Sequence, residues 1–384
     1  MAAWLAEQGY SVHVVAAPPY YPEWRVADTH VGRGYQRERI DGVHVWRAPL
    51  WVPARPNGLK RVLHLLSFAA SSLPVMLTQV FWKPDVVLVV APAFVCTPAA
   101  LITARLSGAK SWLHVQDFEV DVAFKQGLLK GQLLHKLSVA VERWLFKQFD
   151  VVSSISQRMM ARVRDKGVHE PKLIFFPNWV DIDKIRPTAS GSAGLRDQLG
   201  IAADSVVALF SGSLGRKQGL MLLPATAQLL VGLPNLVFVI CGDGVLKQEL
   251  EEACAGLPNV KMLPLQPLDR LGDLLGMADL HLLPQSADAS DLVMPSKLSG
   301  MLASGRAVIA TTAPDTEIAS VLESCGVVVP PEDAPALASA IQALASDRPH
   351  REHLGRQGRR FAEAHLAKTS VLDALQSNLL RLIL

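Results

Sequence analysis

Short runs of apolar residues alternate along the whole chain with longer stretches that can form helices. The runs are rich in Val, Ile and Leu. Strands that are apolar on both sides are typical of parallel sheets covered by helices on both faces. The alternation therefore predicts an α/β fold built from doubly wound parallel sheets. The predicted strands are Val12–Ala16, Val86–Val90, Ser111–Val115, Val151–Ser154, Val206–Phe210, Leu236–Cys241, Val260–Pro264, Leu280–Leu283 and Val308–Thr311.

A stretch near the middle of the chain divides it into two parts. Residues 187–194 read Pro-Thr-Ala-Ser-Gly-Ser-Ala-Gly and contain no large apolar side chain, which is typical of a linker. A chain of 384 residues is long enough for two domains. We predict two Rossmann-like domains that face each other across a cleft, each binding a ligand beyond the carboxyl ends of its strands. The predicted parts are an N-terminal domain at 1–186, a linker at 187–198, a second domain at 199–349, and C-terminal helices at 350–384 that pack back on the first domain.

The two halves of the chain differ in charge. Residues 1–190 carry 23 basic and 15 acidic side chains, a formal charge of +8, whereas the remainder carries 15 and 20, a charge of −5. A basic half favours an anionic partner such as a membrane surface or a phosphorylated substrate. The basic residues are dispersed and no nucleic-acid-binding motif is present, so a nucleic acid is not the expected partner.

Several common motifs are missing from the sequence. It contains no G-x-G-x-x-G, no G-x-x-x-x-G-K-S/T and no H-E-x-x-H, which counts against a dehydrogenase, a P-loop ATPase and a zinc protease. The four cysteines lie far apart, so neither a disulfide framework nor a zinc site is expected. A reducing cytosol is the expected compartment.

The most apolar stretch runs from Val62 to Trp82, directly after Lys60 and Arg61. It is long enough to cross a bilayer. His64, Pro74 and Gln79 count against a spanning helix, so we expect a buried or membrane-lying helix whose flanking cations meet lipid headgroups. This predicts peripheral attachment of the N-terminal half to a membrane.

The first residues of the chain have the pattern of a helix that ends at Gly9, followed directly by a strand. A doubly wound domain usually begins with a strand and a loop before its first helix. One interpretation is a domain that starts on a helix, and the other, which we favour, is a shortened chain or a start codon assigned too late.

Three segments in the C-terminal half have a composition that suits contact with a ligand. Residues 209–219 place Gly212, Ser213, Arg216 and Lys217 after a predicted strand, where backbone amides and two cations suit a pyrophosphate. The alternative is an ordinary strand–helix turn. Gly242, Asp243 and Gly244 follow the next strand, and two glycines there allow either a close approach to a ligand or neighbouring loop, or a plain turn.

The third segment is Pro295-Ser296-Lys297, which begins a helix expected to run to Gly305. Ser296 is the predicted N-cap. A lysine in the first turn is electrostatically unfavourable, and its presence there makes more sense if an anion binds nearby.

Two segments of the N-terminal half follow predicted strands. Residues 114–121 contain Gln116 and Asp117, and Asp117 could orient a hydroxyl or accept its proton; loop capping is the alternative. Residues 18–24 contain Tyr20, Tyr21, Glu23 and Trp24 among prolines, which favours a stiff aromatic platform for a sugar ring or a lipid, or a packed loop.

Taken in order, these segments resemble the retaining glycosyltransferases of family 4, which have the GT-B fold. Phe176–Asp181 is similar to the family's P-N-G-V-D turn, with Trp179 in place of Gly. Gly212–Gly219 resembles its basic diphosphate loop, Gly242–Gly244 its G-x-G turn, and Pro295–Gly305 its helix ending in A-x-G. Within the family, the aromatic segment and the Gln-Asp pair look most like transferases of colanic-acid, other exopolysaccharide or O-antigen assembly.

The chain departs from the family pattern at three places. The two glutamates that the family often carries eight residues apart are Leu292 and Gly300 here, with Asp291 one residue from the first position. The family's frequent His-Asp pair is Gln116-Asp117. Its first strand and Gly-rich loop would precede Met1. Ribose recognition is therefore unassigned, and a catalytic histidine is not carried over.

The resemblance implies transfer of a sugar from a nucleoside-diphosphate sugar to an acceptor hydroxyl with anomeric retention and without a metal or other cofactor. It implies a polyprenyl-diphosphate-linked saccharide as acceptor, at the cytoplasmic face of the membrane. The implied roles are catalysis for Asp117 and Gln116; diphosphate binding for Gly212, Ser213, Arg216, Lys217, Ser296 and Lys297; nucleotide or sugar binding for Gly242, Asp243, Gly244, Asp291, Met294 and Pro295; and acceptor contact for Tyr20, Tyr21, Glu23, Trp24 and Asn178.

Two other interpretations remain open. A sugar-nucleotide 2-epimerase has the same two-domain architecture and would form product with no acceptor present. A non-catalytic nucleotide-binding remnant would bind the donor without turnover.

Overall fold

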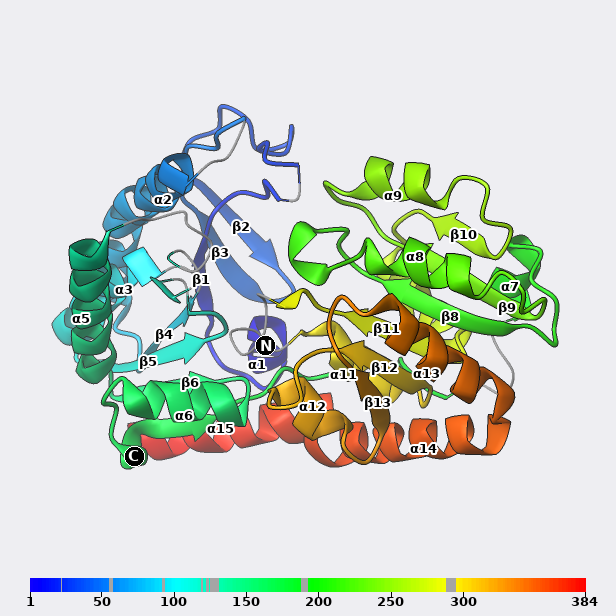
Figure 1. Ribbon diagram of the computed structural model, residues 1–384. Helices are drawn as coiled ribbons and strands as arrows, with labels where there is room; N and C mark the ends of the chain where they lie inside the picture. Colours follow the sequence, from blue (N-terminus) through cyan, green and yellow to red (C-terminus); the bar gives the residue numbers. More distant parts are fainter. Residues whose placement is uncertain are drawn as a thin grey trace. The chain divides into compact units, whose positions relative to one another are not determined.

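A computed structural model describes residues 1–21, 23–54, 58–91, 94–118, 120–121, 124, 131–187, 193–287 and 295–384. The chain divides into two compact units (Figure 1). The first unit consists of Met1–Phe176 together with Leu372–Leu384, and the second of Pro177–Val371.

The division differs from the predicted domain limits. The second unit begins at Pro177, before the predicted linker, and the described end of that linker forms helix α7 (Ala193–Gln198). Leu195 and Arg196 are buried. These two side chains hold the segment on the second unit, although the residues before them are small. Leu372–Leu384 belongs to the first unit, where Gln376 donates a hydrogen bond to the Tyr10 hydroxyl at 3.1 Å.

The first unit begins with helix α1 (Ala2–Glu7) and a three-stranded sheet of order β1-β3-β2. Strand β1 (His13–Ala16) pairs in parallel with β3 (Val43–Arg47), and β2 (Gln36–Ile40) is antiparallel to β3. Asp41 and Gly42 both have positive φ and form a two-residue hairpin turn. Sequence analysis missed this hairpin because β2, Gln-Arg-Glu-Arg-Ile, contains almost no apolar residue.

A second sheet of the first unit has four parallel strands in chain order, β4-β5-β6-β7. Helices connect successive strands, as the alternation of the sequence predicts. The strands are β4 (Val86–Ala91), β5 (Lys110–Val115), β6 (Val151–Ser154) and β7 (Leu173–Phe175). The helices are α2 (Gly58–Gln79), η1 (Val80–Trp82), η2 (Phe94–Cys96), α3 (Thr97–Ser107), α5 (Gln132–Gln148), α6 (Gln157–Asp165) and η3 (Glu170–Lys172).

The second unit contains a parallel sheet of six strands in the order β10-β9-β8-β11-β12-β13. The strands are β8 (Val206–Ser211), β9 (Leu236–Cys241), β10 (Val260–Leu263), β11 (Leu280–Pro284), β12 (Ala307–Thr311) and β13 (Gly326–Val329). The chain adds strands in one direction from β8 to β10 and in the other from β11 to β13. The order therefore reverses between β8 and β11, which is where ligands bind in open parallel sheets.

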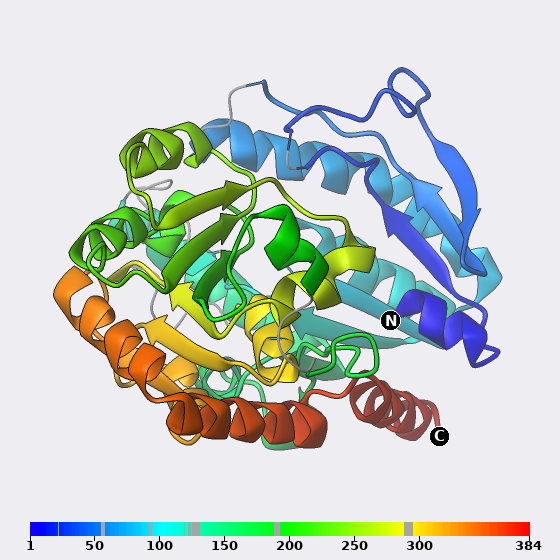
Figure 2. The same cartoon turned by 90° about the vertical axis from the view of Figure 1, so that its right-hand side faces the viewer.

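Helices cover both faces of this sheet (Figure 2). One apolar cluster includes side chains of α8, α9 and α13, and the other includes side chains of α7, α10, α11 and α12. The helices and turns of this unit are η4 (Arg216–Gln218), α8 (Leu222–Leu229), α9 (Lys247–Cys254), η5 (Leu268–Arg270), α10 (Leu271–Gly276), α11 (Lys297–Ala303), α12 (Glu317–Leu322), α13 (Ala334–Ser346) and α14 (Arg348–His365). Helix α15 (Lys368–Ile383) begins in this unit, and from Leu372 onward it belongs to the first unit. The predicted α/β class is confirmed.

Candidate functional site

Two loops of the second unit are joined by backbone hydrogen bonds beside the reversal of strand order. One loop follows β8 and the other follows β9. The Gly212 amide donates to the Cys241 carbonyl at 3.0 Å, and the Leu214 amide donates to the Asp243 carbonyl at 2.8 Å. The Leu246 amide donates back to the Leu214 carbonyl at 3.0 Å. The two glycine-containing motifs therefore form one structure.

The glycines of the second loop allow this close approach. A Cβ atom at Gly242 would lie 1.9 Å from the Gly212 carbonyl oxygen, and one at Gly244 would lie 2.6 Å from that of Leu214. Gly244 also has a φ of 152°, a conformation that other residues rarely adopt. The sequence suggested either a close approach to a ligand or neighbouring loop, or a plain turn. The contacts show a close approach to the neighbouring loop after β8.

Lys297, the first residue of α11, extends to the β8 loop. Its Nζ donates a hydrogen bond to Gln218 Oε1 at 2.8 Å and lies 4.3 Å from the centre of the Phe210 ring. Burial lowers the pKa of Lys297 to about 7. Among the described residues no carboxylate forms an ion pair with Lys297.

The structure gives fewer contacts for the other residues predicted at the donor site. Arg216 is exposed and lies 3.9 Å from Glu249, and Asp243 Oδ1 accepts a bond from the Gly244 amide at 2.7 Å. Ser213 and Ser296 are exposed, and Pro295 is half-buried. Asp291, Met294 and the side chain of Lys217 lie outside the described part of the structure.

The predicted cap at Ser296 is wrong. Ser296 has helical dihedrals, φ −59° and ψ −26°, and its side chain makes no capping bond. An N-cap side chain reaches the following amides from an extended backbone. The helix begins at Lys297 and ends at Ala303, and the Ser299 hydroxyl donates to the Ser296 carbonyl at 2.7 Å.

In the first unit, Gln116 and Asp117 follow β5, as predicted. The Gln116 amide nitrogen lies 3.2 Å from His114 Nε2, and His114 Nδ1 lies 2.9 Å from Ser153 Oγ. Because an amide nitrogen only donates, Nε2 accepts and the ring proton is on Nδ1. Burial lowers the pKa of His114 to about 4, so the ring is neutral. Sequence analysis missed this contact, although His114 and Gln116 are two residues apart in the sequence.

The loop that carries Asp117 is attached to helices α5 and α6. Phe118 is fully buried, with the cations of Arg162 and Lys166 within 6 Å of its ring. Asp121 lies 3.2 Å from Lys166 Nζ, which also pairs with Glu142 of α5. Burial raises the pKa of Glu142 above its usual value, even though Lys166 opposes the shift.

Two of the predicted acceptor-side aromatic residues, Tyr20 and Trp24, pack together in the first unit. The rings of Tyr20 and Trp24 lie 6.0 Å apart, and both contact His64 of α2, at 4.8 and 5.4 Å. Tyr21 and Glu23 are exposed. Asn178, predicted on the acceptor side, belongs to the second unit.

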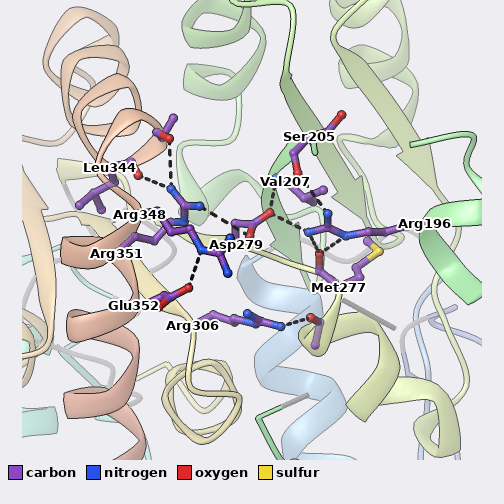
Figure 3. A network of polar contacts seen from close by, with 12 residues as sticks. Arg196, Ser205, Val207, Met277, Asp279, Arg306, Leu344, Arg348, Arg351 and Glu352 are labelled. Carbon is purple, nitrogen blue, oxygen red and sulfur yellow. Dashed lines mark hydrogen bonds and ion pairs between the residues drawn. The ribbon is translucent and has the colours of Figure 1, made fainter. Parts of the chain in front are cut away.

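A buried charged network lies in the second unit, at the end of the six-stranded sheet opposite to the loops after β8 and β9 (Figure 3). Asp279, just before β11, accepts hydrogen bonds from Arg196 at 2.7 Å and from the Val207 amide at 2.9 Å. Arg196 and Arg351 also donate to carbonyls at the ends of α10 and α13, at Met277 and Leu344. This arrangement neutralises helix C-termini and holds helices on the sheet, so we assign it a structural role.

Comparisons with known proteins agree with this architecture. Residues 1–179 match a glycosyl transferase 4-like domain and residues 205–347 match glycosyl transferases group 1. The chain is 41% identical over 382 residues to the colanic acid biosynthesis glycosyl transferase WcaI of Escherichia coli K12, covering 97% of this chain and 92% of that protein. It is 28% identical to the glycosyltransferase WbjE of Pseudomonas aeruginosa, covering 72% of this chain and 70% of WbjE.

Solved structures share the fold at low sequence identity. Sucrose-phosphate synthase from Thermosynechococcus elongatus superposes with a TM-score of 0.73 at 18% identity, covering 99% of this chain and 90% of the other. Anabaena HepE in complex with UDP superposes with a TM-score of 0.70 at 17% identity, covering 96% and 99%. The motifs and the full-length similarity to WcaI thus lead to one assignment: the chain belongs to the family 4 glycosyltransferases with the GT-B fold.

Proposed function

We propose that this glycosyltransferase moves a sugar from a nucleoside-diphosphate sugar to a saccharide acceptor in the assembly of an exopolysaccharide of the colanic-acid type. Its full-length similarity to WcaI supports the pathway. The observation that carries the donor assignment is the half-buried Lys297 at the reversal of strand order, beside two joined glycine loops. HepE, which has the same fold, was solved with UDP and with UDP-glucose.

The donor diphosphate binds, in this proposal, against the Gly212 loop and Lys297. Breaking the bond from the sugar to the diphosphate places negative charge on the leaving phosphate. A half-buried lysine whose Nζ is held by Gln218 and by the Phe210 ring stabilises that charge without having to reorganise. Arg216, which is exposed, adds positive charge beside the same loop. Lys217 is the next residue in the sequence and is a second cation of this segment. The scheme requires no metal ion.

The acceptor binds to the first unit. Its hydroxyl attacks the anomeric carbon as the bond to the diphosphate breaks, and its proton passes to the leaving phosphate or to Asp117. We propose that the product keeps the anomeric configuration of the donor. Tyr20 and Trp24, which are half-buried and pack against the buried His64, offer ring surface to a sugar. A polyprenyl-diphosphate-linked saccharide is the proposed acceptor, and it places the enzyme peripherally at the cytoplasmic face of the membrane.

Calorimetry with UDP- and GDP-sugars tests the donor site. We expect Lys297→Ala to weaken binding about 10- to 100-fold, as charge-assisted hydrogen bonds contribute roughly 1.5–3 kcal/mol. Lys184→Ala removes an exposed lysine of the same unit and is the matched control. Equal affinities in both variants would refute the assignment.

Product analysis tests the reaction. NMR of the product formed from a lipid-linked acceptor reports whether the configuration is retained. Turnover that persists in EDTA supports the metal-free scheme, whereas a strict requirement for a divalent ion contradicts it. Product formed in the absence of any acceptor would indicate an epimerase instead.

A further inference from the structure

Helix α2 presents an apolar side to solvent and a mainly polar side to the protein. His64, Ser72, Val75 and Gln79 are buried, whereas a row of large apolar side chains is exposed. The exposed row is Leu59, Leu63, Leu66, Leu73, Leu77 and, in η1, Phe81. Spacings of three, four and seven residues place these side chains on one face of the helix. A helix of a water-facing surface has the opposite arrangement.

By length and composition alone, Gly58–Trp82 could cross a membrane, and 17% of its most apolar window is buried. The contacts of its inner side argue against a spanning helix. His64 Nδ1 lies 2.6 Å from the Trp51 carbonyl, and Gln79 Oε1 lies 2.7 Å from His13 Nδ1. Pulling α2 into a bilayer would break these bonds and leave polar groups in hydrocarbon. A helix lying in the interface keeps them.

Helix α5 repeats the arrangement and adds charge. Leu133, Leu137, Val141 and Trp144 form an exposed row at spacings of four and three residues, and Leu133 and Trp144 are 83% and 58% exposed. Their opposite face buries Glu142, Leu145 and Phe146. The exposed row is therefore a second apolar face, separate from the one that packs on the unit.

A row of cations runs beside the apolar row of α5. Lys136, Arg143 and Lys147 are exposed and lie seven and four residues apart. A groove of about 480 Å³ follows this side of the helix, lined by these three cations together with Ala140 and Trp144. Cations and an aromatic ring along one groove match the phosphates and the interfacial region of a lipid layer.

The two helices belong to one layer of the first unit. Helix α3 packs against both α2 and α5, and Figure 1 draws the three along one flank of the unit. Arg105 of α3 donates to Gln148 at the end of α5 at 2.9 Å. Across these three helices Glu142 is the sole acidic residue, and it is buried against Lys166. The layer thus offers exposed cations and apolar side chains without an exposed carboxylate on any of the three helices.

We propose that α2, α3 and α5 form a docking face that lies in the interface of an anionic bilayer, with the cationic row of α5 on lipid phosphates. The inference builds on the proposed function, which places the acceptor in a membrane, and names the elements that make the contact. Charge complementarity selects the occupant: a face without exposed carboxylates suits an anionic lipid surface.

Flotation of the full chain with phosphatidylcholine vesicles, with and without phosphatidylglycerol, tests the proposal. Lys136→Gln, Arg143→Gln and Lys147→Gln are combined in one variant. We expect its partition onto anionic vesicles to fall on the order of 100-fold, since each surface cation contributes roughly fivefold. The matched control replaces Arg356, Arg360 and Arg381, three exposed arginines of α14 and α15, by Gln. We expect the control to bind as the native chain does.

A second variant tests the apolar row. Leu137→Ser with Trp144→Ser should lower partition onto vesicles of both compositions, because hydrophobic insertion does not depend on lipid charge. The substituted side chains are exposed, so we expect unchanged thermal midpoints. The docking face would be refuted if the α5 triple variant and the control triple variant lost the same amount of vesicle binding. It would also be refuted if the α5 variants floated with vesicles as the native chain does.

The outcome is separable from that of the proposed function. Nucleotide-sugar affinity in solution should be unchanged in the α5 variants, because the donor loops belong to the other unit. A native chain that transfers sugar to a soluble acceptor but does not float would refute the docking face alone. A chain that floats but binds no nucleotide sugar would refute the proposed donor site and leave the docking face standing.

Discussion

Replacing Gly242 by alanine is the sharpest test of how the two donor loops are built. The new Cβ would lie 1.9 Å from the Gly212 carbonyl oxygen, whereas real Cβ contacts are almost never shorter than 3.0 Å. The loops must therefore separate by about 1 Å. Such a shift strains the bonds from the Gly212 amide to Cys241 and from the Leu214 amide to Asp243.

Overpacking costs about 1–3 kcal/mol, and each weakened backbone bond adds up to about 1 kcal/mol. We expect the free energy of unfolding of the second unit to fall by roughly 2–4 kcal/mol. A displacement of this size at a positioned phosphate site lowers kcat/KM by on the order of 100-fold.

Urea unfolding and steady-state kinetics with a nucleotide sugar measure the two effects. Gly232→Ala is the matched control, because nothing lies within 4 Å of a Cβ at Gly232 and its φ is not positive. The control should change neither stability nor kcat/KM. If Gly242→Ala left both quantities at the native level, the close approach of the two loops would not be needed for the site, and the reasoning would fail.

Three further changes are expected to have measurable effects. Nucleotide-sugar affinity should be constant below pH 7 and fall at higher pH, because the Lys297 pKa of about 7 leaves the free amine neutral there; titration calorimetry should show this slope removed in Lys297→Arg. Asp279→Asn should lower the free energy of unfolding by about 3–5 kcal/mol in urea, since it leaves buried arginines unpaired, with native affinity for nucleotide sugar. Lys166→Met leaves Glu142 buried with a raised pKa. Because the unfolded chain loses the Glu142 proton above pH 4.5 and the folded chain keeps it, the unfolding midpoint of this variant should fall as pH rises above 4.5. An unfolding midpoint that does not change with pH would contradict this expectation.

The sequence predicted that each of the two glycine-containing loops follows an apolar strand, and the structure has them after β8 and β9. It could not show that the loops meet. Gly212 and Gly242 are brought together by the pairing of β8 with β9, and Lys297 reaches Gln218 only because β11 lies beside β8. These are long-range pairings that local periodicity does not encode. The same holds for His114, which burial keeps neutral and which contacts Ser153, a residue of the neighbouring strand.

The apolar helices of the first unit show a different limit of sequence reasoning. Periodicity tells that a helix has an apolar face but not whether that face meets the protein or its surroundings. In α2 the polar residues His64 and Gln79 counted against a membrane-spanning helix. In the structure they point inward to partners on neighbouring segments, and their presence is what leaves the leucines outside. The same residues therefore argue against a spanning helix and in favour of an interfacial one. In α5 the buried Glu142 has the corresponding place, opposite the exposed Trp144, so the position of the polar residues identifies the inner face of each helix.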